Sequence, residues 1–191
     1  MPLWEEYGDV YGVHYDMTQK IQSFQPVASR DARILILGSM PSVQSLAHHQ
    51  YYAHPRNHFW PLMSQVLHSK VPEDYPKRCL WLCEHHVALW DAVQQCARKG
   101  SLDANIREAV PNPIGSFLQE HGKISAIFFN GTAAKKYFER FHHVPPSIQT
   151  ALLPSSSPIP RPGLITVEDK IPAWMKIWDE LQKQDEYRQP M

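Results

Sequence analysis

Cysteine is scarce in this chain, and no CxxC pair occurs among its three cysteines, Cys79, Cys83 and Cys96. An odd number of thiols without paired spacing argues against a disulfide framework and indicates a reducing, intracellular setting. Long apolar runs are also missing, which excludes a transmembrane span, and the start lacks the charged and apolar segments of a secretion signal. We therefore expect a cytoplasmic protein, or a nuclear one in a eukaryote, with no membrane partner.

Net charge is absent as well, because 19 basic residues balance 19 acidic ones. This balance gives no global electrostatic indication of nucleic-acid binding, so any contact with DNA must come from a local patch. The G-x-S-x-G, G-x-G-x-x-G and Walker motifs do not occur. The sequence therefore does not indicate a nucleophile-elbow hydrolase or a common nucleotide-binding loop.

Metal-ligand spacing is missing too. His54 and His58 are four residues apart, but Pro55 places His54 before the predicted helix, and no carboxylate or thiolate joins them. The C-x3-C-x-H-H pattern at 79–86 does not match structural zinc sites, and its cysteines are better explained as helix packing. We therefore expect no metal and no cofactor.

The chain does contain short apolar runs that alternate with amphipathic segments. The apolar runs predict strands at 33–37, 87–90, 124–129 and 148–153. Helical spacing predicts helices at 57–68, 72–86, 113–120, 131–141 and 168–184. Strands that alternate with helices predict an α/β fold with a mainly parallel sheet between two helix layers.

A length of 191 residues fits one domain with a full core. We predict an N-terminal arm at 1–22 and a single domain at 23–191, with the first 30 residues forming an irregular arm or a short strand. The segment 100–113 is rich in turn residues and predicts a loop. No repeat or linker divides the chain.

Polar residues follow three of the predicted strands. Gly38-Ser39-Met40-Pro41-Ser42 follows the first, Asn130-Gly131 the third, and Ser155-Ser156-Ser157-Pro158 the last. Open α/β sheets bind their ligands at the carboxyl ends of the strands. Three loops from three strands therefore predict one site.

Two asparagines in these loops are candidate polar groups without charge. An amide offers an acceptor and two donors in one plane, so Asn57 and Asn130 suit the orientation of a water or a base edge. The alternatives are structural: Asn57 is well placed to cap the helix that follows, and Asn130 before a glycine suits a turn. Spacing alone does not decide between these roles.

Aromatic and hydroxyl side chains in the same loops also allow two interpretations. Tyr51 and Tyr52 suit stacking on a flat ligand, or one of them packs inward while the other covers the loop. The serines at 155–157 lie between prolines and suit phosphate contacts or an exposed turn.

Taken together, these loops resemble the uracil-DNA glycosylase superfamily, and most closely its hypoxanthine-DNA glycosylase branch. The longest match is the Tyr-Tyr-Ala-His-Pro-Arg-Asn-x-Phe-Trp string at 51–60. The matching segments occur in the family's order, at 36–42, 51–60, 89–91, 100–103, 129–131 and 153–158. Each fragment is short, but the ordered set covers nearly the whole domain.

The resemblance implies a three-layer α/β/α sandwich around a four-stranded sheet, and a monomeric, metal-free enzyme. Many superfamily members use an acidic or amide residue to handle the attacking water at the position of Met40, which cannot do so. The hypoxanthine branch is similar in this respect, and there the residue matching Asn57 is taken as catalytic, with the match to Asn130 assisting.

The same resemblance implies the remaining site residues. Expected base contacts are Gly38, Ser39, Met40, Tyr52 and Asn130, with Tyr52 stacking on the flipped base. Expected DNA contacts are His54, Arg56, Ser155, Ser156 and Ser157. The loop at 153–158 matches the one that enters the duplex, although the Ile-Pro-Arg at 159–161 departs from the small residues of the family.

The implied function is a monofunctional glycosylase that removes hypoxanthine from double- or single-stranded DNA and so starts base-excision repair. Such an enzyme needs no strong base, because neutral amides can orient water and donate to the departing base. Two alternatives remain: a uracil- or mixed-lesion glycosylase of the same fold, and a non-catalytic module that binds damaged DNA or nucleotides.

Overall fold

Three buried apolar strands and a more exposed edge strand form the central sheet in the computed structural model of the protein, which describes residues 20–186. Their order across the sheet is β3-β2-β6-β7, and every neighbouring pair is parallel. The bounds are Ile34–Gly38 (β2), Val87–Asp91 (β3), Ala126–Asn130 (β6) and Gln149–Leu153 (β7). All four predicted strands are confirmed, with boundary shifts of one or two residues.

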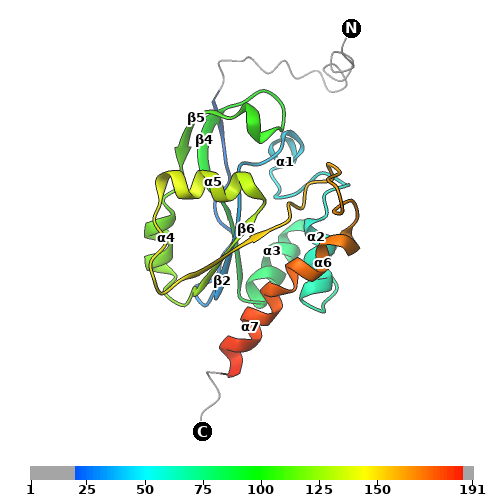
Figure 1. The fold of residues 1–191 in the computed structure, drawn as a ribbon, viewed down its shortest axis with the longest axis vertical. Helices are drawn as coiled ribbons and strands as arrows, with labels where there is room; N and C mark the ends of the chain where they lie inside the picture. The colour runs from blue at the N-terminus through cyan, green and yellow to red at the C-terminus, as the bar shows by residue number, and fades with distance from the viewer. Residues whose placement is uncertain (1–19, 187–191) are drawn as a thin grey trace.

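Helices cover both faces of this sheet (Figure 1). One layer consists of α2 (Phe59–Val66), α3 (Tyr75–Glu84), α6 (Val167–Trp174) and α7 (Lys176–Glu186). The other consists of α4 (Ile114–Glu120) and α5 (Thr132–Phe141). The predicted three-layer α/β/α sandwich is therefore confirmed.

Alternation along the strands explains why two layers form. Side chains of a strand point to opposite faces in turn, so Ile34 and Ile36 pack under α2 and α6, whereas Leu35 and Leu37 pack under α4 and α5. Both faces of β2, β3 and β6 are covered, so these strands carry continuous apolar runs rather than an alternating pattern. This is why strands were the clearest signal in the sequence.

A second sheet lies beside the first and corrects the prediction of a loop at 100–113. It has three antiparallel strands in the order β1-β4-β5, with bounds Lys20–Gln22 (β1), Val93–Ala97 (β4) and Arg107–Pro111 (β5). Register shifts interrupt the β4–β5 pairing, and most of β5 is exposed. Irregular pairing of this kind removes the period-two pattern by which a strand is predicted.

The predicted N-terminal arm is only partly described by the structure, because residues 1–19 lie outside the described range. The last part of the arm forms β1 and pairs with β4. A small core beneath this sheet joins it to the main domain and contains Met40, Val93, Cys96 and Ile106.

The C-terminal helix predicted at 168–184 is two helices, α6 and α7, which meet at Met175. Pro172 lies inside α6 and lacks the N–H that would continue the backbone ladder, so a single straight helix is disfavoured. A short helix that the sequence did not predict, α1 (Val43–His48), follows the first strand and is capped by Ser42 Oγ, which accepts from Ser45 N.

Candidate active site

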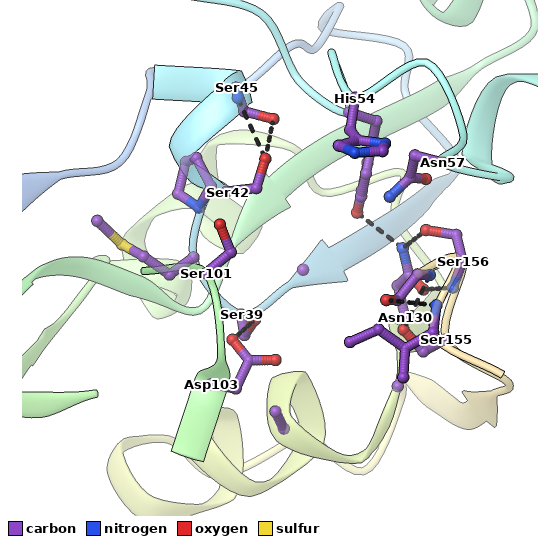
Figure 2. A pocket seen from close by; sticks show the side chains of 18 of the residues that line it. Ser39, Ser42, Ser45, His54, Asn57, Ser101, Asp103, Asn130, Ser155 and Ser156 are labelled. Atoms are coloured by element: carbon purple, nitrogen blue, oxygen red, sulfur yellow. Dashed lines mark hydrogen bonds between the residues drawn. The ribbon is translucent and has the colours of Figure 1, made fainter. Parts of the chain in front are cut away.

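The main cavity of the protein lies at the carboxyl edge of the central sheet and has a volume of about 680 Å³. Its walls are the loops that follow β2, β6 and β7, together with the end of β3 and the segment around Asp103. Figure 2 shows these side chains arranged around the hollow. The prediction that three loops meet at one site is confirmed.

Asn57 lies on the wall of the main cavity at the start of α2 (Figure 2). Its Oδ1 accepts a hydrogen bond of 2.9 Å from Phe59 N, so the side chain forms an Asx turn that leads into α2, whose N-cap residue is His58; this is close to the capping role that the structural alternative predicted. This bond decides the orientation of the amide, because Oδ1 must be the acceptor. The Nδ2 donor group is therefore the end of the amide left for the cavity (Figure 2), so the structural interpretation of Asn57 holds, and its role toward a water or a base stays a prediction.

Asn130 ends β6 and is held by two neighbouring loops. Its Nδ2 donates to Tyr52 Oη at 2.8 Å and to Ser156 Oγ at 2.9 Å, and its Oδ1 accepts from Ser156 N at 2.8 Å. Both amide hydrogens are used, so one lone pair on Oδ1 is the remaining hydrogen-bonding capacity of the side chain. Asn130 can therefore accept from a ligand but has no further hydrogen to donate.

The two tyrosines of the first loop have different roles. Tyr51 is 3% exposed and packs edge-on against Phe24, so it belongs to the core. Tyr52 lines the cavity, and its ring stacks on Phe59 with centroids 4.0 Å apart. Burial raises the pKa of the Tyr52 hydroxyl well above its ordinary value, which keeps it protonated. The interpretation in which one tyrosine packs inward is confirmed.

The serine loop after β7 is less exposed than the sequence suggested. Ser156 is 1% exposed and its polar atoms hold Asn130, so its side chain has no free surface for the phosphate contact predicted from the sequence. Ser155 and Ser157 are half-buried, line the cavity and remain candidates for that contact. Ser156 instead positions the asparagine at the cavity floor.

Lys170 connects the serine loop to the start of α2 by hydrogen bonds. Its side chain is 2% exposed, and Nζ donates to Ser157 O at 2.9 Å and lies 3.0 Å from His58 Nδ1. Burial and the nearby ammonium lower the pKa of His58, so the ring is neutral and accepts at Nδ1. His58 N also donates to Ser156 O at 2.9 Å, so the serine loop is joined at two points to the residues next to Asn57 at the start of α2.

The other predicted DNA contacts lie at the rim. His54 and Arg56 line the main cavity, and His54 Nδ1 accepts from Arg56 N at 3.1 Å. Arg56 is exposed, which suits a contact with a ligand outside the cavity. Both residues are therefore brought to the site, at the mouth rather than the floor.

Met40 has a structural place in addition to the predicted base contact. It touches the cavity, but it is 7% exposed and packs in the small core with Val93, Cys96 and Ile106. Its thioether therefore joins the second sheet to the site. Ser39 beside it donates a 2.6 Å hydrogen bond from Oγ to Asp103 Oδ1.

Two carboxyl groups in the cavity were not predicted as site residues from the sequence. Asp91 and Asp103 both line it, and burial raises the pKa of each, that of Asp91 to about 7. Arg98 lies near both carboxyls and opposes these shifts. Asp91 directly follows a predicted strand, so its place at the ligand-binding edge was a usable signal. Asp103 ends the segment 100–103 that matches the family, which was the available signal for it.

Gly38 lets Asp91 and Tyr52 approach the end of β2. A Cβ at this position would collide with Asp91 Oδ1 and would lie 3.2 Å from Tyr52 Oη. Asp91 is 3% exposed, and its Oδ2 accepts from Ser23 Oγ at 3.3 Å, so it has little room to move. Glycine is therefore needed here for space.

We expect Gly38→Ala to lower the free energy of unfolding by about 1–3 kcal/mol, because the added methyl group overfills a packed site. Gly115→Ala is the matched control, since a Cβ there has no atom within 4 Å and alanine favours a helix. Urea denaturation of both variants measures the difference. Equal midpoints for the two variants would contradict the packing argument.

The described residues, 20–186, contain no group of three or more histidine, cysteine or carboxylate side chains that could hold a metal ion. In the same range no helix has the length and apolarity needed to cross a membrane. The polar groups that line the main cavity are amides, hydroxyls and the carboxyls of Asp91 and Asp103, together with His54, Arg56 and Arg161.

Comparisons with known proteins match this site and fold. The sequence profile of the Uracil DNA glycosylase superfamily matches residues 25–181. A protein named hypoxanthine DNA glycosylase from Methanosarcina barkeri is 32% identical over 119 residues, which are 62% of this chain and 75% of that protein. A protein of the same name from Methanosarcina acetivorans is 32% identical over 137 residues, 71% of this chain and 85% of the other.

The solved structures include a similar fold. A solution NMR structure of a proposed uracil DNA glycosylase from Methanosarcina acetivorans has a TM-score of 0.72 and 28% identity, covering 86% of this chain and 99% of that one. The match of the superfamily profile to most of the chain confirms the resemblance described from the loops. The chain belongs to the uracil DNA glycosylase superfamily and is a DNA glycosylase.

Proposed function

We propose that this glycosylase removes hypoxanthine from deoxyinosine in DNA by hydrolysis of the N-glycosidic bond. The observation that carries the proposal is the fixed amide of Asn57, whose donor group faces the cavity while its acceptor is held by Phe59 N. Two relatives that carry the name hypoxanthine DNA glycosylase support the choice of base.

Hydrolysis of this bond builds positive charge on the sugar and negative charge on the departing base. Fixed hydrogen-bond donors aimed at the developing negative charge stabilise the transition state, commonly by a factor of 10²–10³ for one donor. Asn57 supplies such a donor without a charge of its own. Its Nδ2 can also donate a hydrogen bond to the oxygen of the attacking water. Its Oδ1 already accepts from Phe59 N and is therefore not free to accept a hydrogen from that water.

Asn130 and Tyr52 suit recognition of the flipped base. The remaining lone pair of Asn130 Oδ1 is an acceptor, and Asn130 is held in place by Tyr52 Oη and Ser156. Hypoxanthine carries a hydrogen on N1, whereas adenine presents a bare nitrogen acceptor there. An acceptor at this point therefore pairs with the lesion and leaves adenine unpaired, which costs on the order of 1–3 kcal/mol for each buried unsatisfied group.

The serine loop suits the task of opening the duplex. It is held against α2 by Lys170 and by the bond from His58 N to Ser156 O, so it can press on DNA without losing its shape. Flipping a poorly paired base costs less than flipping a normal one, which adds selectivity for deaminated bases.

A uracil- or mixed-lesion activity is the second candidate, and one feature favours it. Uracil also carries a ring N–H that an Asn130 acceptor would satisfy, so this contact distinguishes both lesions from adenine but not from each other. The non-catalytic binding module considered from the sequence is not favoured, because the relatives are named DNA glycosylases, and it serves only as an outcome of the test below.

Incubation with oligonucleotides that carry deoxyinosine, deoxyuridine or only normal bases, followed by alkali cleavage, tests the proposal. We expect strand scission at deoxyinosine, slower scission at deoxyuridine and none in the unmodified strand. Faster release of uracil than of hypoxanthine would favour the second candidate. Binding to a deoxyinosine duplex with no scission at either lesion would favour the binding module and defeat the enzymatic proposal.

A further inference from the structure

A second hollow, which we call the α5 groove, runs between α5 and the segment Ala104–Arg107 and has a volume of about 480 Å³. It shares Asp103, Ala104, Thr132 and Ala133 with the main cavity, so the two hollows adjoin at these residues. The groove lies outside the catalytic and base-binding residues discussed above, apart from Asp103 at the junction.

The α5 groove is positively charged in a chain without net charge. Three exposed cations line it, Arg107, Lys136 and Arg140, against the single carboxyl of Asp103. That carboxyl already accepts from Ser39 Oγ. The groove therefore carries a local excess of positive charge.

Nearby carboxylates do not cancel this excess, because they pair with other lysines. Glu139 on α5 lies 3.6 Å from Lys135 Nζ, and Glu108 on β5 lies 3.3 Å from Lys20 Nζ. Arg107 is also fixed in place, since its Nη1 donates to Ala104 O and to Ile106 O. The remaining donors of this guanidinium are held at the edge of the groove.

Spacing along the helix favours a ligand with repeated charges. Lys136 and Arg140 are one helical turn apart, about 6 Å along the axis, and Thr132 to Arg140 spans about 12 Å. Successive phosphates of a DNA strand are farther apart along its backbone than the 3.4 Å rise along the helix axis, so this length accommodates about two of them. A single small anion would use only part of such a groove.

We propose that the α5 groove binds the sugar–phosphate backbone of the lesion strand on one side of the flipped nucleotide. The proposal rests on the proposed function in one respect, namely that the main cavity receives a nucleotide of this strand. Because the two hollows join at Thr132 and Asp103, the strand continues from the cavity into the groove along α5. The groove then sets how much flanking DNA the enzyme needs on that side.

The test compares Lys136→Ala/Arg140→Ala with the wild type in binding to a labelled duplex that carries a stable abasic-site analogue. Loss of two phosphate contacts should weaken binding about tenfold at 50 mM salt and reduce the slope of log K against log salt by about 1.8. Fluorescence anisotropy over a salt series measures both quantities. Alanine is a good helix former, so α5 should remain folded.

The matched control is Arg30→Ala/Lys123→Ala, which also removes one arginine and one lysine. Both control residues are exposed and precede strands β2 and β6, so they lie toward the opposite edge of the sheet from the cavity. The control should keep the wild-type affinity and salt slope. A loss in the control equal to that of Lys136→Ala/Arg140→Ala would overturn the proposal, as would an unchanged slope in the latter.

A second arm locates the strand. Single-stranded oligonucleotides with the abasic analogue and six flanking nucleotides on only the 5′ or only the 3′ side are compared, and the Lys136→Ala/Arg140→Ala variant should lose affinity for one of the two. Equal losses on both sides would indicate general electrostatics and contradict a groove for one flank. None of these measurements needs base release, so a protein that binds in this way but releases no base would defeat the proposed function alone.

Discussion

Asn57→Asp is expected to lower the rate of base release from deoxyinosine DNA by about 10²–10³-fold while the protein stays as stable as the wild type. The substitution keeps an oxygen that accepts from Phe59 N, so the turn at the start of α2 is kept. It replaces the donor group that faces the cavity with a second oxygen. Negative charge developing on the base would then meet an acceptor instead of a donor.

This variant separates the two roles of Asn57 that the sequence left open. A residue that acts only as a cap should tolerate aspartate, because a negative charge at a helix N-terminus is favourable. A residue that donates a hydrogen bond to the departing base should not tolerate aspartate, because the substitution removes the donor. Asn57→Ala removes both roles and is expected to lose about 1 kcal/mol of stability together with the activity.

Single-turnover rates and urea unfolding of the same preparations measure both effects. Met40→Ala is the control, since Met40 packs in the small core and has no donor to lose. We expect it to reduce stability more than the rate. An Asn57→Asp protein with near wild-type rate would show that the amide donor is not needed, and equal rate losses for Asn57→Ala and Met40→Ala would mean that the catalytic group lies elsewhere.

Asp91→Asn is expected to stabilise the folded protein increasingly as the pH rises, by about 3 kcal/mol between pH 5 and pH 8 relative to the wild type. Burial raises the pKa of the Asp91 carboxyl from 3.8 to about 7 in the folded protein. Between these values the folded chain keeps a proton that the unfolded chain has lost. Raising the pH therefore favours unfolding, and the loss is complete above about pH 7.

Asparagine does not titrate, so Asp91→Asn removes this penalty and keeps a side chain of the same shape. Urea unfolding at pH 5 and pH 8 measures the difference between variant and wild type. Asp169→Asn is a control of opposite sign, because backbone N–H groups of Thr166 and Ile165 lower the pKa of that carboxyl and the ionised form caps α6. A difference between Asp91→Asn and the wild type that does not change with pH would contradict the buried, protonated state.

The protonation of Asp91 also bears on the proposed chemistry. A neutral carboxyl at the cavity floor does not repel the negative charge that develops on the departing base. Ionisation of Asp91 above about pH 7 would place a like charge beneath Tyr52 and Asn130. Groups of the cavity with raised pKa values can thus support leaving-group departure without acting as acid or base.

The strands show how much of the fold the sequence could predict. The strands β2, β3 and β6 are runs of apolar residues because both of their faces are buried, and this signal is local, whereas the edge strand β7 is mostly exposed. The second sheet was not predicted, because β5 is exposed, irregularly paired with β4 and contains Glu108 with a positive φ of 50°. Its place depends on contacts with β4 and with the small core around Met40, which no window of neighbouring residues contains.

The site was predicted to a different extent. The asparagines were chosen from motif order, and the structure brings both to the cavity. Ser156 was grouped with its neighbours as a DNA contact because all three serines share one exposed-looking sequence context. Its burial arises from hydrogen bonds with Asn130, 26 positions away, and local sequence carries no signal for such a bond.

By itself, the sequence determined the α/β architecture, the order of the loops at the carboxyl edge and membership of the superfamily, since these follow from local hydrophobic periodicity and from motifs in a fixed order. Only the tertiary structure decided which end of the Asn57 amide faces the cavity, that Asn130 retains an acceptor, that burial raises the pKa of Asp91, and that three cations line one groove beside α5. The physical reason is that orientation, burial and net local charge depend on partners distant in the chain, such as Asn130 and Tyr52, which are 78 positions apart.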